Sequence, residues 1–300
     1  MDSPLKIQNV SKYYGEDVGV KNVSADLNAG EIFGFLGPNG AGKTTTIRLI
    51  LDFIRPTEGA ITVLGQDSAE DSLSIKKRIG YLAGDIALYP DLKGIQLLQY
   101  MTALGRETDW EYVTQLADML EAQLDKPIKE LSKGNKQKIG LLQAFMHRPD
   151  LVVLDEPTSG LDPLMQRVFY QIVEDARDNG KTVFLSSHNL HEVQRLCDRA
   201  AFIRQGSLIG VEDIKKLEAL SLRRYRIRFN EEAPTDKLEQ IDNVSEVERD
   251  ELYPNSVNLA VSGSPQSLLK ELSRFEVLDL GELETSLEDV FMHYYDEEPS

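Results

Sequence analysis

The chain has 300 residues, 41% of them hydrophobic, and a formal net charge of −17 at pH 7. That size and apolar content allow one large domain or two modest ones with a packed core. The acidic balance argues against non-specific nucleic-acid binding, which depends on a basic surface. No apolar run approaches the ~18 residues that a membrane-spanning helix needs, and the single cysteine, Cys197, excludes an internal disulfide. We therefore expect a cytosolic protein without an export signal, in which Cys197 is a buried structural thiol.

The first half of the chain predicts strands, a glycine-rich loop and a block of helices, in that order. Apolar alternation over the first thirty residues is typical of strands, and the run Ile32–Leu36 predicts a strand that leads into the loop. A helical pattern follows at about residues 47–51, and another short strand at 61–64. Apolar residues at three- and four-residue spacing then predict a helical block over about 91–147.

Strands and helices alternate in the segment that follows. The continuous apolar run Leu151–Leu154 is typical of a strand buried on both faces of a parallel sheet. Strands at 182–185 and 200–203 alternate with helices at about 163–179 and 190–197. This alternation predicts a mainly parallel α/β sheet, into which the helical block is inserted.

A shift in charge marks a second domain after about residue 220. Residues 222–300 carry 19 acidic and 8 basic side chains. Their apolar pattern predicts the order β-α-β-β-α-β with a final extra helix, which is the ferredoxin-like arrangement of a small α+β domain. We interpret the alternating Arg224, Arg226 and Arg228 as a solvated sheet face rather than a ligand site. The apolar stripe of the final helix, from Leu283 to Tyr294, is interpreted as packing.

The segment Gly37–Thr45, GPNGAGKTT, satisfies the phosphate-loop pattern G-x-x-x-x-G-K-[ST]. A predicted strand leads into it and a predicted helix leads out. In that setting backbone N–H groups and the helix dipole attract an anion, Lys43 adds a full positive charge, and the Thr44 hydroxyl can bind Mg²⁺. The loop predicts a nucleoside triphosphate site without saying which nucleotide it takes.

Three later segments carry further chemistry. Asp155 and Glu156 end the predicted strand 151–154, where Asp155 can contribute to a Mg²⁺ shell and Glu156 can polarise a water molecule. His188 follows the strand 182–185, at the end where ligands of parallel sheets collect. Ser132 and Gly134 precede a helix and form a second local anion site. A second site in one chain is understandable if it serves a nucleotide bound to another copy.

The order of GPNGAGKTT, LSKGN, LVVLDEP, SGLD and SSH resembles the ATP-binding subunit of an ABC transporter over about residues 4–218. The resemblance implies a P-loop ABC ATPase core in residues 1–220, with a helical subdomain at about 91–147, followed by an acidic accessory domain in 221–300. It also implies a head-to-tail dimer with ATP and Mg²⁺ held between the chains.

The family's residue roles carry over position by position. Tyr14 matches the aromatic that stacks on adenine, Glu156 the catalytic base and His188 the γ-phosphate sensor. Thr44 and Asp155 match the metal-associated residues, and Ser159–Asp162 the loop that couples the two sites. The residues that the resemblance assigns to ATP are Tyr14, Gly37, Pro38, Asn39, Gly40, Ala41, Gly42, Lys43, Thr44, Thr45, Ser132, Gly134 and Asn135.

The sequence departs from the family pattern at three positions. Gly84 stands where the family usually has glutamine, so no side chain can reach a metal or a water molecule there, and Asp85 is displaced by one residue. Lys133 and Asn135 replace the glycine and glutamine that are common in the signature segment. Because Ser132 and Gly134 are retained, we expect the contact with the partner chain to survive.

The resemblance predicts an ATPase that drives a separate integral membrane permease, as an exporter, from the cytoplasmic face of the membrane. Its partners would be that permease and a second copy or a paralogous ATPase subunit, and not nucleic acid. The segment Leu287–Phe291 is similar to the end of ATPase subunits of bacterial exporters. One alternative is a soluble ABC-type ATPase without a membrane partner, and another is a regulatory module with an inactive site at Gly84. The transported substrate is not predicted.

Overall fold

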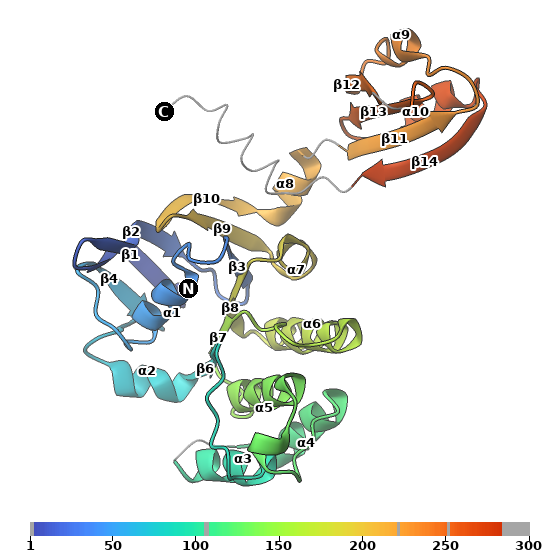
Figure 1. Ribbon diagram of the computed structural model, residues 1–300. Coiled ribbons are helices and arrows are strands. Elements are labelled where there is room, and N and C mark those ends of the chain that lie inside the picture. Colours follow the sequence, from blue (N-terminus) through green and yellow to red (C-terminus); the bar gives the residue numbers. More distant parts are fainter. Residues whose placement is uncertain (1–2, 105–107, 221–222, 251–252, 284–300) are drawn as a thin grey trace. The chain divides into compact units, whose positions relative to one another are not determined.

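The computed structural model describes residues 3–104, 108–220, 223–250 and 253–283 (Figure 1). The chain divides into two compact units, Met1–Glu212 and Asp213–Ser300. The helix α8 (Ile214–Leu220) belongs to the second unit, whereas the charge pattern placed the domain boundary at residue 220. No helix of the described residues is long and apolar enough to cross a membrane.

A six-stranded sheet forms the centre of the first unit, with the strand order β10-β9-β3-β8-β7-β6. The strands β3, β8, β7 and β6 pair in parallel, so their carboxyl ends meet at one edge. The mainly parallel α/β sheet predicted from the sequence is therefore confirmed. Its strands are β3 (Ile32–Leu36), β6 (Ile79–Leu82), β7 (Leu151–Asp155), β8 (Thr182–Ser187), β9 (Arg199–Arg204) and β10 (Ser207–Asp213).

The first predicted strands form a separate antiparallel sheet, which the sequence pattern did not distinguish from the parallel one. β1 pairs with β2 on one side and β4 on the other, and α1 (Lys43–Ile50) lies between this sheet and the parallel sheet (Figure 1). Alternate residues of β1 are buried, as expected for a sheet with one face toward solvent. The sheet consists of β1 (Leu5–Tyr14), β2 (Asp17–Asp26), β4 (Glu58–Val63) and β5 (Gln66–Asp67).

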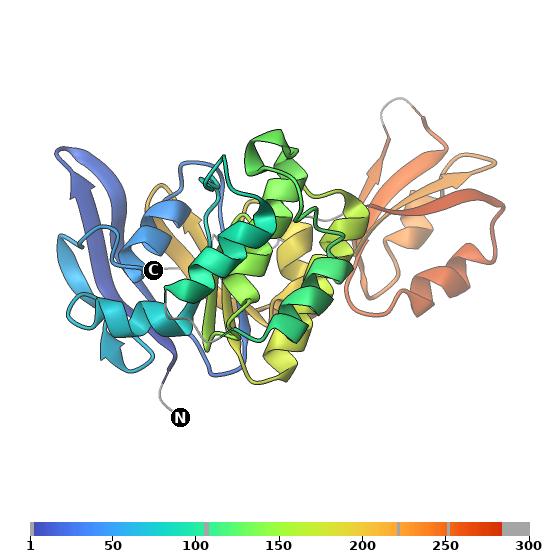
Figure 2. The same ribbon diagram turned by 90° about the horizontal axis from the view of Figure 1, so that it is seen from below.

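Helices α5 (Lys133–Phe145), α6 (Pro163–Asp178) and α7 (Leu190–Leu196) cover the other face of the parallel sheet (Figure 1). The predicted helical block is confirmed as α3 (Gly94–Ala103), α4 (Trp110–Met119), a 3₁₀ turn (Ile128–Glu130) and α5 (Figure 2). The short helix α2 (Ser72–Arg78) precedes β6. The starts of α4, α5 and α6 are fixed by side-chain caps from Asp109, Ser132 and Asp162, which accept backbone N–H groups of the first turn.

Glycines allow helices to approach the sheet closely at two places. A Cβ atom on Gly34 of β3 would lie 2.9 Å from the Cys197 sulfur at the end of α7. Cys197 is buried, and burial raises the pKa of its thiol, so the predicted structural role is confirmed. A Cβ atom on Gly80 of β6 would lie 2.0 Å from the Ala144 carbonyl oxygen in α5.

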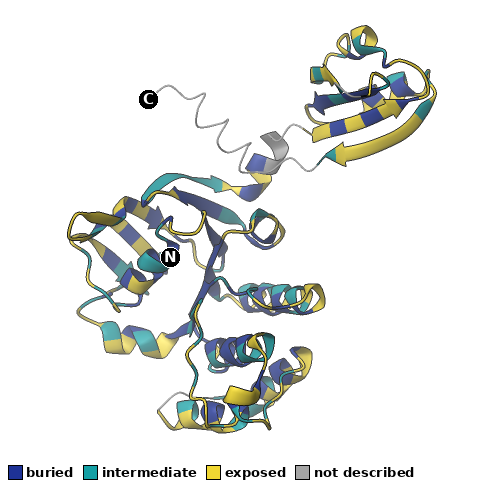
Figure 3. Ribbon diagram, in the orientation of Figure 1, coloured by how far each residue is buried: buried dark blue, intermediate teal, exposed yellow. Residues whose placement is uncertain are grey.

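The second unit contains a four-stranded antiparallel sheet with the order β12-β13-β11-β14. Two helices connect its strands, which gives the predicted ferredoxin-like order. Arg224, Arg226 and Arg228 are exposed while the residues between them are buried, so the solvated face is confirmed (Figure 3). Leu283, where the predicted final helix begins, is the last residue of a strand instead, and the rest of that predicted helix lies outside the described residues. The elements are β11 (Arg223–Phe229), α9 (Thr235–Leu238), β12 (Val244–Arg249), β13 (Ser256–Val261), α10 (Gln266–Leu272) and β14 (Val277–Leu283).

The close approach at Gly80 generates a stability prediction. Gly80→Ala places a methyl group against the Ala144 carbonyl, and overpacking of this kind costs about 1–3 kcal/mol. We expect a lower unfolding midpoint of the first unit in urea, followed by circular dichroism. Gly281→Ala is the control, because a Cβ atom there meets nothing within 4 Å. Equal midpoints for Gly80→Ala and the wild type would contradict the tight contact between β6 and α5.

Candidate functional site

The glycine-rich loop joins the buried strand β3 to α1. Gly40 and Gly42 have φ angles of 81° and 110°, which are unfavourable for residues with a side chain. A Cβ atom on Gly37 would lie 2.3 Å from the Ile203 carbonyl oxygen of β9. The loop therefore needs these glycines for both its curvature and its contact with the sheet, and its backbone stays accessible to an anion.

Lys43 is the first residue of α1, and its side chain is 6% exposed. Its Nζ donates to the carbonyl oxygens of Gly37 at 2.6 Å and Pro38 at 3.2 Å. The same ammonium group forms an ion pair of 3.2 Å with Glu156 Oε1. The positive charge is thus held within the loop and beside the acidic end of β7.

Thr44 and Asp155 meet across the first helix turn and the end of β7. The Thr44 hydroxyl donates to Asp155 Oδ2 at 2.8 Å, and the Ser186 hydroxyl donates to Asp155 Oδ1 at 2.6 Å. Asp155 and Ser186 are paired residues of β7 and β8, and both are buried. The register of the two strands therefore fixes the orientation of the Asp155 carboxylate.

Glu156 lies between Lys43 and His188. Its φ of 49° is left-handed, which costs energy for a residue other than glycine and is common at functional sites. Its N–H lies 3.2 Å from both the carbonyl and the hydroxyl oxygen of Ser186. Its Oε2 lies 2.7 Å from Nδ1 of the exposed His188. The strained backbone turns the Glu156 carboxylate toward the Lys43 ammonium and the His188 ring.

Two cavities flank the loop. One, of about 480 Å³, contains Thr44, Asp155, Glu156 and His188 in its lining, and the other, of about 270 Å³, lies over Gly40, Gly42 and Lys43. Asn39, Thr44 and Glu156 line both cavities. The predicted residues of the loop, the acidic strand end and His188 are thus brought together. Three predicted loop residues, Gly37, Pro38 and Ala41, line neither cavity, and the Ala41 side chain is buried in the core.

Tyr14 lies at the end of β1, with its ring 47% exposed. A Cβ atom on Gly19 would meet the Tyr14 ring at 2.8 Å and the Thr45 methyl group at 3.3 Å. Gly19 and Thr45 line the smaller cavity, so the ring stands beside it without being part of its lining. This position suits an aromatic that stacks on a base whose phosphates enter the loop.

The structure does not bring Ser132, Gly134 and Asn135 to Lys43 within one chain. None of the three belongs to the lining of either cavity among the described residues. Ser132 caps α5 by accepting the N–H of Asn135 at 3.3 Å. A Cβ atom on Gly134 would lie 2.7 Å from the Gly160 carbonyl oxygen, so this segment packs on the loop 159–162. Lys133 adds a hydrogen bond of 3.0 Å to the Ser159 hydroxyl.

Gly84 lies directly beside the acidic end of β7. A Cβ atom there would be 3.2 Å from Asp155 Oδ2, because β6 pairs with β7 and leads straight into this position. Asp85 lines the larger cavity. The position that the family fills with glutamine therefore does adjoin the Asp155 carboxylate, and this chain leaves it without a side chain.

Sequence reasoning did not assign a role to three residues of the site. The Ser186 hydroxyl forms hydrogen bonds with both Asp155 and Glu156. The sequence feature that could have indicated this role is its position at the end of a predicted strand, in Ser-Ser-His. Arg48, one helical turn after Thr44, and Tyr81, near the end of β6, both line the larger cavity. Burial, reinforced by the charge of Asp155, raises the pKa of Tyr81 to about 12, so its phenol is a hydrogen-bond donor at neutral pH.

The oxygen atoms near the loop fit Mg²⁺. A hydroxyl and a carboxylate are ligands that this hard cation prefers, and it usually takes its other ligands from water and phosphate. Thr44 and Asp155 supply such a pair within hydrogen-bonding distance of each other. The set of chain ligands is small, as expected for a metal that arrives with a polyphosphate.

Comparisons with known proteins agree with this geometry. Residues 20–159 match the ABC transporter family. Residues 210–295 match a second family, the C-terminal domain of DrrA1-3-like ATP-binding proteins. An uncharacterized ABC transporter ATP-binding protein of Methanocaldococcus jannaschii is 36% identical over 226 residues, covering 71% of this chain and 80% of the relative. The bacitracin transport ATP-binding protein BcrA of Bacillus licheniformis is 30% identical over 302 residues, covering 97% of each chain.

A solved structure described as the ATP binding subunit of an ABC transporter superposes with a TM-score of 0.66 at 27% identity. It covers 72% of this chain and 92% of that one.

The buried link through Ser186 generates a prediction for catalysis. Ser186→Ala removes the donor to Asp155 and an acceptor of the Glu156 N–H, and losing a buried hydrogen bond to a charged group costs about 1.5–3 kcal/mol. We expect kcat for ATP hydrolysis to fall on the order of tenfold to a hundredfold. Ser24→Ala, which removes an exposed hydrogen bond to Asn9, is the matched control. An unchanged kcat in Ser186→Ala would show that this hydroxyl does not position the carboxylate.

Proposed function

Because the chain belongs to the ABC transporter family of ATP-binding proteins, we propose that it powers a separate membrane permease through ATP-dependent dimerisation. The chain is the ATP-binding subunit of an ABC transporter and an ATPase. The observation that carries the proposal is the convergence of Lys43, Asp155, Glu156 and His188 on one edge of the parallel sheet.

We assign the chemical roles from the contacts of each side chain. The loop backbone and Lys43 would bind the β- and γ-phosphates, because Gly40, Gly42 and Lys43 line the same small cavity. Glu156 would accept a proton from the attacking water as general base, and His188 would contact the γ-phosphate. Ser186 holds the backbone of Glu156 and the carboxylate of Asp155 in place.

Mg²⁺ is proposed as the metal of this site. When bound, it would neutralise charge that develops on the phosphate oxygens. Thr44 and Asp155 would hold it, since their oxygens already face one another at 2.8 Å.

The arrangement of Ser132 and Gly134 supports a site completed by a second chain. Both residues lie at the start of α5, where Gly134 packs on Gly160, and neither lines the cavity beside Lys43 or the larger cavity. The N-terminus of α5 is an anion-attracting group, and the side chains of Ser132 and Lys133 are exposed there. We infer that it contacts the γ-phosphate bound to a partner copy or a paralogous ATPase subunit.

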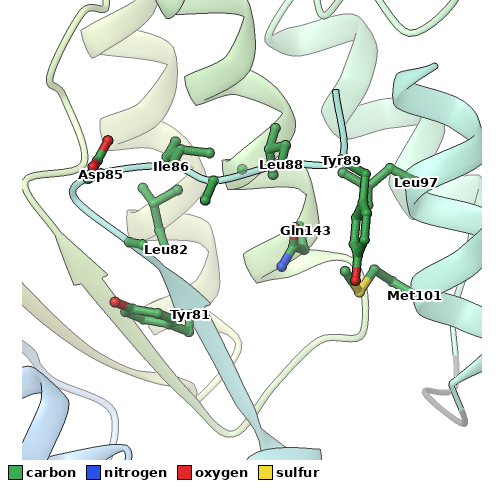
Figure 4. Close-up of a pocket in the computed structure, with 12 residues that line it drawn as sticks. Tyr81, Leu82, Asp85, Ile86, Leu88, Tyr89, Leu97, Met101 and Gln143 are labelled. Carbon is green, nitrogen blue, oxygen red and sulfur yellow. The ribbon is translucent and has the colours of Figure 1, made fainter. Parts of the chain in front are cut away.

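A third cavity supports a docking site for the permease. It measures about 210 Å³ and is formed by the segment after β6 together with α3 and α5 (Figure 4). In Figure 4 the Tyr89 ring lies beside Met101 and Leu97. Its mostly apolar lining suits an apolar side chain of a partner helix. Asp85 lines this cavity and the nucleotide cavity, so we propose that Asp85 connects the two sites in place of the missing side chain at Gly84.

The relatives support an exporter. BcrA, which matches along almost its whole length, is described as a bacitracin transport protein. The second unit matches the C-terminal domain of DrrA1-3-like ATP-binding proteins. We propose that the permease exports a drug-like or peptide compound, with this chain bound peripherally at the cytoplasmic face of the membrane.

The role of Glu156 leads to a test of the dimer mechanism. Glu156→Gln removes the proton acceptor while keeping the volume, so hydrolysis should fall about 10²–10⁴-fold. ATP and Mg²⁺ should then hold a stable dimer, measured by light scattering after size-exclusion chromatography. Glu58→Gln, an exposed change in β4, should leave turnover and association unchanged. A monomeric variant with normal turnover would contradict the mechanism.

The third cavity leads to a test of permease binding. Met101→Glu places a charge in the apolar lining, so less multispanning membrane protein should co-purify from detergent-solubilised membranes. ATP binding should not change, because Met101 does not line the loop cavities. Met119→Glu, on the neighbouring helix α4, is the matched control, since Met119 is 37% exposed and outside the cavity lining. Recovery with ribosomes or DNA, and never with a membrane protein, would favour a soluble ABC-type ATPase.

A further inference from the structure

We propose that Glu192, in the first turn of α7, is a positioning residue that holds the His188 segment for ATP hydrolysis, and that it does so as an uncharged carboxylic acid. The proposal rests on the catalytic roles proposed above for Glu156 and His188. Glu192 itself lines neither nucleotide cavity among the described residues, so it is not placed to touch ATP.

Glu192 is connected to both residues that flank His188. Its side chain is buried, and its Oε2 accepts the Ser187 hydroxyl at 2.5 Å. The same hydroxyl oxygen accepts the N–H of Asn189 at 2.9 Å. Asn189 is the N-cap of α7, and Glu192 is its third helical residue. In a capping box the third residue reaches back to the N-cap N–H directly, whereas here the Ser187 hydroxyl lies between them.

The hydrogen bonds from Glu192 to Ser187 and from Ser187 to Asn189, called the relay below, matter because the exposed His188 has few other restraints within the described part of the chain. The His188 side chain is 58% exposed, and its Nδ1 contacts Glu156 Oε2 at 2.7 Å. The carbonyl of Ser187 accepts the N–H of Gly37, so the same short segment also borders the phosphate loop. Fixing Ser187 and Asn189 through Glu192 therefore fixes the backbone of His188 relative to both Glu156 and the loop.

The surroundings of Glu192 favour its neutral form. Glu192 Oε1 is buried and makes no well-aligned hydrogen bond within the described part of the chain, and no cationic side chain there forms an ion pair with Glu192. Leaving an ionised carboxylate oxygen in that state is costly. Burial raises the pKa of Glu192 to about 7, and the charge of Glu156 adds to the shift. The groups that lower it are the hydroxyls of Ser187 and Thr158 and the charge of His188.

The other titratable groups around Glu192 include the cation Arg195 of α7, whose guanidinium pairs with Glu174 and whose charge lowers the pKa of Tyr170. Tyr170 of α6 and Cys197 at the end of α7 both have pKa values raised by burial first and by the charge of Glu192 second. Ionisation of Glu192 would thus add an unpaired negative charge to a buried region that already adjoins Glu156. We expect it to weaken the relay that holds His188.

The first test is the pH profile of ATP hydrolysis by the purified full chain between pH 6 and 9. Glu192→Gln preserves a neutral group with one acceptor and one donor, so kcat should stay within about twofold of the wild type at pH 6.5. The wild type should lose activity as pH rises through about 7, and Glu192→Gln should lack that decline. Glu192→Ala should lower kcat about tenfold at every pH while KM for ATP changes little, because Lys43 and the loop are intact.

The matched control is Glu174→Gln on α6, which removes a carboxylate paired with Arg195 of α7. It should keep the wild-type pH profile. A Glu192→Gln profile with the same alkaline decline as the wild type, or kcat as low as that of Glu192→Ala throughout, would overturn the proposal. If the wild-type chain hydrolyses no ATP, the proposed function fails as well, and the second test still applies to Glu192.

The second test needs no catalysis. The pKa of Glu192 is raised from 4.5 to about 7 by folding, so its stabilising contribution is present below pH 4.5 and is lost as pH rises through about 7. The melting temperature of Glu192→Gln minus that of the wild type should therefore be more positive at pH 8 than at pH 5. An equal difference at both pH values would show that Glu192 is ionised in the folded protein and would overturn its uncharged role.

Discussion

The parallel register of β3, β8 and β7 is the constraint on which the rest of the structure depends. It sets Leu36 beside Ser187 and Asp155 beside Ser186, so that the phosphate loop and the acidic strand end begin at the same edge. The three strands are buried along their whole length, so a shift in register would expose apolar residues to water or bury polar ones. The favourable free energy of burying these apolar strands therefore maintains the geometry of the site.

In the site, two carboxylates are held by hydrogen-bond donors that the surrounding chain fixes in place. Lys43 is fixed by loop carbonyls and Glu156, and Asp155 by hydroxyls from Thr44 and Ser186. Such preorganised groups need little rearrangement when charge develops on a transferring phosphoryl group. Ser132 and Gly134, at the start of α5, line neither cavity, which is why we propose that a second chain completes the site.

Local patterns predicted most of the architecture. The helical block and the ferredoxin-like unit followed from apolar periodicity, because burial imposes a period of two on half-exposed strands and about 3.6 on helices. The parallel sheet followed from continuous apolar runs that alternate with helical segments. The separate antiparallel sheet formed by β1, β2, β4 and β5 was not predicted. Alternation identifies strands but not their partners, and strand pairing depends on contacts between distant segments.

The sequence by itself determined that this protein binds a nucleoside triphosphate and belongs to the ABC transporter family, since GPNGAGKTT and the later motifs are local patterns with fixed spacing. Only the tertiary structure decided how those motifs act on one another. It placed Gly84 beside Asp155, linked Ser186 to both acidic residues and buried Glu192 behind His188. These relations depend on strand register and on burial, which change the orientation and the pKa of a side chain without leaving a pattern in the neighbouring sequence.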